Sequence, residues 1–297
     1  MLDKLEYLIA LSREQHFGRA AETCGVTQPT LSAGIKQLEE MLGVLLVQRG
    51  SRFIGFTPEG ERTLDWARRI VSDSRSMRQE ITALKKGLNG RLKIAAIPTA
   101  LAMVAAITTP YRARHPDVRF TVWSRTSLEI LTLMENLEID AGLTYLDNEP
   151  LGRVNAVPLY QERYQLLTAA DAPLGNRERV TWKEVSQVPL CLLTPDMQNR
   201  RIIDGLLRAA GGDVQPTLES DSMILLFAHV RTGRWASVMP AKLAETLGLT
   251  TTIRAIPIVE PEAVHTIGLV VPPREPLTPL AAALVVEAKR LAATLAA

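Results

Sequence analysis

The segment Gly25-Val26-Thr27-Gln28-Pro29-Thr30-Leu31-Ser32 (residues 25–32) separates two predicted helices near the start of the chain. Gly25 suits the C-cap of a short helix that carries Ala20, Ala21 and Cys24. Thr27 suits the N-cap of the next helix, and Pro29 fits just inside its first turn. That helix has an apolar stripe with helical spacing, which predicts a buried face made of Leu31, Ile35, Leu38 and Leu42.

The opposite face of this second helix is polar, and we expect it to contact DNA. Glutamine can read an adenine edge with two hydrogen bonds, hydroxyls reach bases or phosphate, and lysine adds charge against phosphate. The same polar face would also suit an ordinary exposed helix. The candidate DNA-binding residues are Arg19, Thr27, Gln28, Pro29, Thr30, Ser32, Lys36, Arg49 and Arg52.

The flanking segments complete a small domain. A first helix carries Leu2, Leu5, Leu8 and Ile9 on one face. After Gly43, the segment from Leu45 to Phe56 places Arg49 and Arg52 between apolar residues, which predicts a basic two-stranded wing. His16 lies beside the two central helices, where either phosphate contact or simple packing would suit it.

Thr57-Pro58 opens a long helix that is predicted to end near Gly87 and Gly90. Apolar or small residues recur along it with heptad spacing: Thr63, Ala67, Ile70, Ser74, Met77, Ile81, Leu84 and Leu88. A lone helix with such a seam is not stable in water, so the seam needs a partner. Dimerisation is the favoured interpretation, and packing on the chain's own domains is the alternative.

Composition limits the remaining choices. The chain has 297 residues, is 46% hydrophobic and carries a formal net charge of +2, so a DNA footprint must come from charge placement and not from net charge. Two cysteines and no signal-peptide or membrane-span pattern predict a reduced, cytoplasmic protein. The four histidines show no metal spacing, and the common enzyme motifs are absent, so neither a metal, a cofactor nor an enzyme activity is expected.

From residue 91 onward, short apolar runs alternate with helical stretches. Residues 92–97, 118–122 and 141–145 read as strands, with helices between them, and a similar pattern begins again after Arg163. Thr181 and Glu184 form a predicted capping box. This order favours a mainly parallel sheet covered by helices and, overall, two α/β lobes of similar size.

The N-terminal third resembles the LysR-type family of transcription regulators. The resemblance rests on residues 17–22 (FGRAAE), 26–32 (VTQPTLS) and 56–60 (FTPEG), together with Ile35, Leu38-Glu39, Leu42-Gly43, Leu46 and Arg49. It implies an α+β multidomain protein: a winged helix-turn-helix (1–58), a linker helix for dimerisation (59–90) and a two-lobed domain similar to periplasmic binding proteins (91–297). Lobe I would comprise 91–161 and 267–297, and lobe II would comprise 162–266. The resemblance further implies a homodimer or homotetramer on promoter DNA, with RNA polymerase as a candidate further partner.

The resemblance also implies a small-molecule effector between the lobes. Helix N-termini converge there in the family pattern, and their free N–H groups suit a carboxylate or another small anion. The candidate effector-binding residues are Thr99, Ala100, Thr126, Ser127, Gln198, Asn199 and Met223. The competing interpretation of the threonines and the serine is that they only cap helices.

Within that family the N-terminal residues are most similar to the peroxide-sensing branch, which uses a cysteine pair in its sensor domain. Here the sensor region holds only Cys191, so the intramolecular disulfide switch is absent. Cys24 is expected to be a small core residue. Two other functions stay open at this point: a non-specific architectural DNA binder, and a small-molecule binding protein or enzyme with an idle N-terminal domain.

Overall fold

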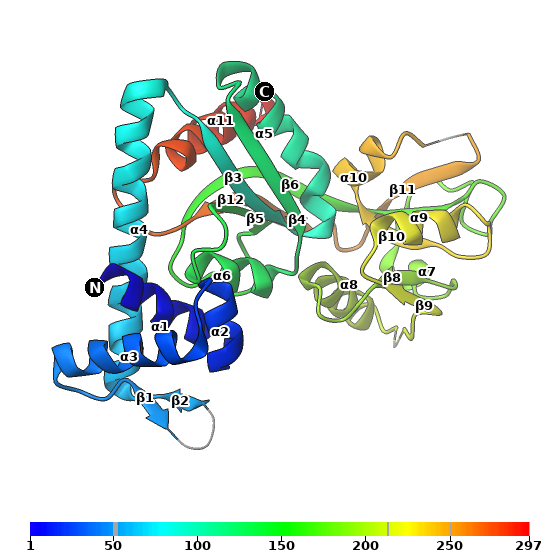
Figure 1. Cartoon of the computed structure of the whole chain (residues 1–297). Helices are drawn as coiled ribbons and strands as arrows, with labels where there is room; N and C mark the ends of the chain where they lie inside the picture. Colours follow the sequence, from blue (N-terminus) through cyan, green and yellow to red (C-terminus); the bar gives the residue numbers. More distant parts are fainter. Residues whose placement is uncertain (50–52, 213, 250, 297) are drawn as a thin grey trace. The chain divides into compact units, whose positions relative to one another are not determined.

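The computed structural model describes residues 1–49, 53–212, 214–249 and 251–296 (Figure 1). The chain divides into two compact units, one of Met1–Gly87 with Glu135–Glu138 and one of Leu88–Met134 with Ile139–Ala297. In these described residues, no helix is both long enough and apolar enough to cross a membrane. Of the predicted wing residues, Arg52 lies outside the described residues, and Arg49 is described only as part of a strand.

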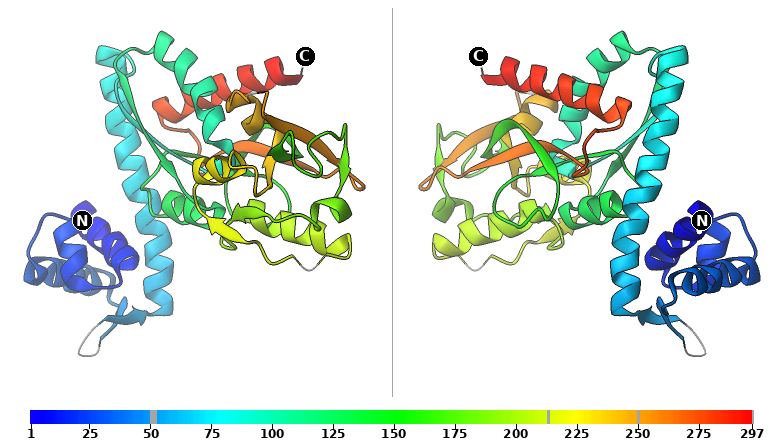
Figure 2. Two further views of the ribbon diagram at one scale, coloured as in Figure 1. Left: turned by 90° about the vertical axis from the view of Figure 1, so that its right-hand side faces the viewer. Right: turned by 90° about the vertical axis from the view of Figure 1, so that its left-hand side faces the viewer.

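The first unit is a three-helix cluster with a hairpin and a long helix. Helices α1 (Leu2–Glu14), α2 (Phe17–Thr23) and α3 (Gln28–Leu42) pack together near one end of α4 (Pro58–Lys86) in every view of Figures 1 and 2. Strands β1 (Val47–Arg49) and β2 (Phe53–Phe56) pair antiparallel and form the predicted wing. The core contains Leu8, Leu11, Leu31, Ile35 and Leu38, all almost completely buried.

Helix α3 begins and ends where its capping residues predict. The Thr27 side chain accepts from the backbone N–H of Thr30, and Gly43 ends the helix in the left-handed region at φ 70°. The prediction that Leu42 is buried is wrong, because its side chain is 48% exposed. Leu42 occupies the last turn, beyond the region packed against α1 and α2, and Leu46 fills the inward position after the helix ends.

Helix α4 has two apolar faces with different surroundings. Leu64, Ala67 and Val71 are buried in the core of the first unit. Four members of the predicted heptad seam are exposed: Ile70, Met77, Ile81 and Leu84. Within the described residues, the seam therefore packs against its own chain near Ala67 and at Leu88, and these four side chains between them are left exposed.

The second unit is built on an eight-stranded sheet with the order β4-β3-β5-β12-β6-β11-β7, and β10 also pairs with β6. Strands β3 (Gly90–Ala96), β4 (Val118–Ser124) and β5 (Ala141–Tyr145) are parallel, as the alternating strand and helix pattern predicts. Helices α5 (Leu101–Arg114) and α11 (Pro279–Ala296) lie side by side, and α6 (Ser127–Glu135) follows β4 (Figure 1). The 3-10 turn η1 (Pro98–Ala100) joins β3 to α5.

The remaining elements form the second lobe, whose buried residues are divided between the main core and a separate apolar cluster. They are β7 (Val180–Thr181), α7 (Trp182–Val185), β8 (Cys191–Leu193), α8 (Gln198–Ala209), β9 (Leu218–Ser220), α9 (Met223–Val230), β10 (Ser237–Pro240), α10 (Ala241–Thr246) and β11 (Ile253–Val259). The predicted capping box of Thr181 and Glu184 is present at the start of α7. Strands β8 and β9 pair parallel in a separate two-stranded sheet.

One long strand serves both lobes. Strand β6 (Asn155–Ala169) pairs with β12 (Val264–Val271) through its first half and with β10 and β11 through its second half. The sequence suggested a new start after Arg163, but the strand continues through that position without interruption. The polar run of residues 161–163 looks like a break, although it alternates: Gln161 and Arg163 are exposed, and Glu162 is buried.

Candidate nucleic-acid interface and effector site

The first turn of α3 carries an exposed polar surface. Thr27, Gln28, Pro29 and Thr30 are all exposed, and Ser32 is partly exposed. The hydroxyls of Thr27 and Thr30 lie 2.8 Å apart, so they form a hydrogen-bonded pair at the helix start. The capped turn is anchored by the buried Leu31 on the other side of the helix.

Helices α2 and α3 approach each other closely at Gly18. A Cβ atom on Gly18 would lie 3.1 Å from Cε1 of His16 and 3.5 Å from Oε1 of Gln28. The Gln28 side chain therefore lies beside the start of α2, with Gly18 leaving room for it. A Cβ at this position would press on the His16 ring and would make an ordinary contact with Gln28.

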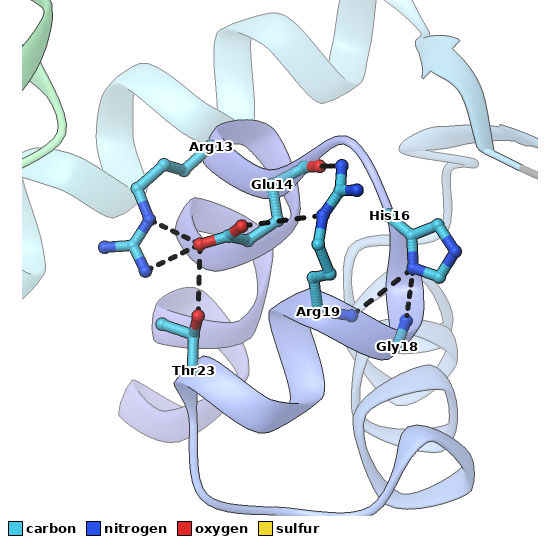
Figure 3. A network of polar contacts seen from close by, with 6 residues as sticks. All are labelled: Arg13, Glu14, His16, Gly18, Arg19 and Thr23. Carbon is cyan, nitrogen blue, oxygen red and sulfur yellow. Dashed lines mark hydrogen bonds and ion pairs between the residues drawn. The ribbon is translucent and has the colours of Figure 1, made fainter.

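The start of α2 is fixed by a polar network that the sequence did not reveal (Figure 3). Nδ1 of His16 accepts from the backbone N–H groups of Gly18 at 3.1 Å and Arg19 at 3.3 Å. His16 is thus the N-cap of α2, a role that serine, threonine or aspartate usually fills. Accepting at Nδ1 requires the neutral ring with its proton on Nε2.

Glu14 is the centre of the same network. Its Oε1 accepts from Nε of Arg13 at 2.9 Å and from the hydroxyl of Thr23 at 3.0 Å, so it ties α1 to both ends of α2. Arg19 donates to the carbonyl oxygen of Glu14 at 2.7 Å. The hydrogen bond from Arg13 is the main reason why the pKa of Glu14 lies below its ordinary value.

The predicted phosphate-binding cations differ in how far they are engaged. The Arg19 side chain is 62% exposed, but its guanidinium points toward Glu14 (Figure 3). Lys36 is 67% exposed and lies 3.7 Å from Glu40, a surface ion pair of small energy that can yield to a phosphate. The side chains of Arg49 and Arg52 are not described, so their contribution stays a prediction.

The predicted effector residues of lobe I gather at one edge of the sheet. Strands β3, β4 and β5 are parallel neighbours, so their carboxyl ends meet at that edge. Thr99 and Ala100 follow β3, and Thr126 and Ser127 follow β4. The backbone N–H of Arg125 donates to the carbonyl of Ala96 at 3.0 Å, which holds the two connections together. All four residues are buried.

Their hydroxyl groups have different roles. The Thr126 hydroxyl accepts from the backbone N–H of Glu129 at 3.2 Å, and Glu129 accepts from the N–H of Thr126 at 2.8 Å. Thr126 is therefore a helix cap. The hydroxyl oxygens of Thr99 and Ser127 are buried without a hydrogen-bond partner within the described residues. Buried hydroxyls nearly always find partners, so Thr99 and Ser127 are the stronger candidates for ligand contact.

Helix α8 of lobe II reaches the same edge. The side-chain amide of Gln198 donates to the carbonyl of Asp147 at 3.2 Å, and that of Asn199 donates to the Tyr145 hydroxyl at 3.0 Å. Arg201 binds the Glu149 carboxylate with two hydrogen bonds of 2.7 and 2.8 Å. The first turn of α8 is thus tied to the segment that follows β5.

Met223 completes the predicted set. It is buried in the second-lobe cluster together with Met197, and Ala102 from the first turn of α5 packs against this cluster. The cluster that contains Met223 therefore reaches the first turn of α5, directly after Thr99 and Ala100. Within the described part of the chain, no group of three or more His, Cys, Asp or Glu side chains could hold a metal ion.

Neither cysteine is an activated thiol. Cys24 and Cys191 are both free, and burial raises the pKa of each thiol, that of Cys191 to about 11. A thiol with a raised pKa holds little of the reactive thiolate near neutral pH. Cys191 instead contacts the backbone carbonyl of Ala236 at 3.5 Å.

A buried polar cluster next to the carboxyl end of β5 was missed from the sequence. Tyr145 donates a short hydrogen bond to Oε1 of Glu162, whose carboxyl group is 1% exposed. Tyr160 and Tyr164 flank Glu162 on the same face of β6, and both are also buried. The alternation of Tyr160, Glu162 and Tyr164 could have indicated this shared face, had the strand been recognised as continuous.

Two family models together cover nearly the whole chain. The model described as "Bacterial regulatory helix-turn-helix protein, lysR family" matches residues 2–61. The model described as "LysR substrate binding domain" matches residues 85–293.

Curated relatives match over most of their length. The DNA-binding transcriptional dual regulator OxyR of Escherichia coli is 30% identical over 274 residues, which cover 92% of this chain and 90% of that protein. The hydrogen peroxide-inducible genes activator of Dickeya chrysanthemi is 29% identical over the same length, covering 92% of this chain and 90% of its own.

Solved structures agree with these matches. A full-length OxyR variant from Pseudomonas aeruginosa has a TM-score of 0.74 and 26% identity, covering 97% of each chain. Full-length CbnR in complex with its target DNA has a TM-score of 0.60 and 21% identity, covering 98% of this chain and 99% of that one, and this supports the fold alone.

Proposed function

The chain belongs to the LysR family of bacterial transcription regulators, and from this premise we propose which of its residues read DNA and which hold the effector. It is a DNA-binding transcription regulator with an effector-binding domain, and its homologues are regulators and not enzymes. The N-terminal winged helix-turn-helix is the DNA-binding part, and the two-lobed α/β domain is the sensor.

We propose that the first turn of α3 enters the major groove. One observation carries this proposal: exposed Gln28 and Thr30 project from a turn that Thr27 caps and Leu31 anchors. In helix-turn-helix proteins the N-terminal residues of the second helix contact base edges. Gln28 would read an adenine, while Thr30, Ser32 and Lys36 would contact bases or phosphate. Arg49 and Arg52 of the wing would meet the flanking backbone.

Replacing Gln28 by alanine tests this role. Gln28→Ala should reduce the ratio of specific to random-DNA affinity by about 1–3 kcal/mol, the value of one bidentate base contact. Gln37→Ala is the matched control, because Gln37 is an exposed glutamine on the same helix, farther from its start. Gel-shift titrations on the DNA upstream of the gene and on random duplex measure the ratio. An equal loss on both duplexes would remove Gln28 from base reading.

A homodimer would place two recognition helices about one DNA turn, or a multiple of it, apart. The exposed apolar residues Met77, Ile81 and Leu84 of α4 support this assembly, because together they form a stripe that water solvates poorly. Pairing of two dimers into a tetramer, contact with RNA polymerase and a cytoplasmic location are part of the same proposal. A variant that carries both Met77→Lys and Leu84→Lys should sediment as a monomer. An unchanged dimer would exclude this stripe as the interface.

We further propose that the effector binds at the carboxyl edge of β3, β4 and β5. The unpartnered hydroxyls of Thr99 and Ser127 support this position, with Ala100, Thr126, Gln198, Asn199 and Met223 around them. A carboxylate or another small anion would suit the free N–H groups of the helix starts. The ligand shifts DNA binding only as far as it prefers one lobe arrangement over another.

The two threonines allow a direct comparison. Thr99→Ala should leave DNA affinity intact and blunt the response to the effector. Thr126→Ala should mainly weaken the start of α6, because its hydroxyl already caps that helix. Footprinting with a panel of small carboxylates and inorganic anions measures both. If Thr99→Ala responds like the wild type, Thr99 does not contact the ligand.

A further inference from the structure

A relay of three buried side chains crosses from lobe II through lobe I to the shared strand. Nδ2 of Asn199 on α8 donates to the hydroxyl of Tyr145 on β5 at 3.0 Å. The Tyr145 hydroxyl donates to Oε1 of Glu162 on β6. All three residues are less than 5% exposed, so water does not compete for these hydrogen bonds.

The surroundings of Glu162 favour its neutral form. Burial raises the pKa of the Glu162 carboxyl to about 8, and the nearby Asp147 adds to the rise, while the hydrogen bond from Tyr145 opposes it. The titratable groups around it are Tyr145 on β5, Asp147 after β5, Tyr160 and Tyr164 on β6 itself, and His265, which is paired with it on β12.

The nearby cations are engaged elsewhere. Arg200 binds Asp204 and Glu219 at 2.7 and 2.6 Å, and Arg201 binds Glu149. His265 lies 3.1 Å from Asp147. Among the described residues, no ion pair of Glu162 is found, so the geometry itself favours an uncharged carboxyl group at this point.

The relay fixes the orientation of the Asn199 amide. Because Nδ2 donates to the Tyr145 hydroxyl, the carbonyl oxygen Oδ1 points away from that hydroxyl. Oδ1 receives no hydrogen bond from the described residues. At the lobe I side of the same edge, the hydroxyls of Thr99 and Ser127 also lack partners. Lobe II thus presents an oriented acceptor, and lobe I presents hydroxyls that can donate or accept.

We propose that Asn199 selects an effector with an O–H or N–H donor, and that Tyr145 and Glu162 are the positioning residues that aim its carbonyl oxygen. This inference rests on the proposed effector site and narrows its ligand class. The ligand is a small carboxylate that carries a hydroxyl or amino group, the carboxylate facing Thr99 and Ser127 and the donor facing Asn199. Tyr145 and Glu162 act through Asn199 and do not touch the ligand.

Ligand-free crystal structures of two conservative variants test the positioning. Tyr145→Phe removes the acceptor of the Asn199 N–H, so the Asn199 amide should turn or take two orientations. Glu162→Gln keeps an oxygen that accepts from Tyr145, so Asn199 should stay as it is. An Asn199 side chain with wild-type orientation in Tyr145→Phe would overturn the proposal, as would one displaced in Glu162→Gln.

Calorimetric titration of the full-length protein tests the ligand class. The probes are three matched pairs that differ by one hydroxyl: glycolate and acetate, lactate and propionate, and malate and succinate. At least one hydroxy acid should bind about tenfold more tightly than its partner, the value of one hydrogen bond to a buried acceptor. Tyr145→Phe should lose this preference and Glu162→Gln should keep it.

The contrast between the two variants separates positioning from a merely structural role. Both substitutions are close in shape to the wild-type side chain, but only Tyr145→Phe removes the hydroxyl that accepts from Asn199. Equal binding within every pair, or no binding by any hydroxy acid, overturns the ligand class. DNA retardation by the same preparation shows separately whether the proposed regulator function holds, because that function fails only if no duplex is bound.

Discussion

Glu14 and Glu162 are two carboxyl groups at the centres of two polar networks, and their environments act on them in opposite directions. Glu14 joins α1 to α2 in the DNA-binding unit, is partly exposed and has a guanidinium beside it. Glu162 lies on the strand shared by both lobes of the sensor, is buried and has tyrosines beside it. The pKa of Glu14 lies below its ordinary value, mainly because of the Arg13 hydrogen bond, and burial raises that of Glu162 to about 8.

This difference in charge state indicates that the two networks have different structural roles. A charged carboxylate with several donors holds a junction firmly and contributes over the whole neutral range. A neutral carboxyl group in a dry cluster is sensitive to anything that changes its charge or its one hydrogen bond. The DNA-binding unit therefore uses its glutamate as a fixed anchor, whereas the sensor has one whose state can change.

The largest expected effect is on the stability of the sensor at alkaline pH. Because the folded-state pKa of Glu162 is raised, its favourable contribution is complete below the unfolded value of 4.5 and is lost as the pH rises through about 8. Each unit of this shift corresponds to about 1.4 kcal/mol. Glu162→Gln should therefore be more stable than the wild type at pH 9 by several kcal/mol, with the difference vanishing toward pH 4.5.

Urea unfolding of both proteins between pH 5 and pH 9 measures this difference. Hydrogen exchange of β6 peptides over the same pH range provides a second measurement. Glu219→Gln is a suitable control, because Glu219 is a partly exposed carboxylate of lobe II that is paired with Arg200. If the stability of Glu162→Gln changes with pH in parallel with the wild type, Glu162 is ionised in the fold and the contrast with Glu14 disappears.

A smaller effect of opposite sign is expected at Glu14. Its folded-state pKa is lowered, so its contribution is present above the ordinary carboxyl value of 4.5 and is lost as the pH falls through the lower folded value. Glu14→Gln should destabilise the DNA-binding unit by about 1 kcal/mol at pH 7, since the network is partly screened by solvent, and by less at pH 3.

Hydrogen exchange of α2 amides reports on this loss. Glu22→Gln, on the exposed side of α2, should leave exchange unchanged. A Glu14→Gln protein whose α2 amides exchange as slowly as those of the wild type at pH 7 would mean that Arg13, Arg19 and Thr23 hold the junction without the charge.

Features that depend on neighbouring residues were predicted well from the sequence. Thr27, Gly43, Thr57 and the capping box of Thr181 all cap the helices that their residue types predict, because capping depends on a few neighbouring atoms. The buried stripe of α3 was correct up to Leu38 and wrong at Leu42, where the helix has passed the end of the core.

Hydrogen-bond partners and burial that depend on residues distant in the sequence could not be predicted. Thr99 and Thr126 look alike in the sequence, yet Thr126 caps α6 and the Thr99 hydroxyl has no partner among the described residues. Glu162 seemed to lie in a polar break between two lobes, because its burial depends on β5, α8 and β12 packing over it. Residues that different elements bring together cannot be recognised from spacing along one element.

The smallest effect concerns His16, where the DNA-binding unit uses an unusual cap. His16→Ala should cost about 0.5 kcal/mol, near the low end for N-caps, since the two bonds at 3.1 and 3.3 Å are exposed. His16→Asp should restore the lost stability, because its carboxylate accepts from the same N–H groups and favours a helix start.

Gly18 lies against the His16 ring and close to Gln28, so His16→Ala should also weaken specific DNA binding slightly. A purely local cap would change only the hydrogen exchange of the α2 amides. Gel shifts on specific and random duplex decide between these outcomes. The affinity for the specific duplex should fall when the α2 amides exchange faster in His16→Ala, and both should recover in His16→Asp. This correlation would show that the junction of α1 and α2 positions Gln28 for its base contact.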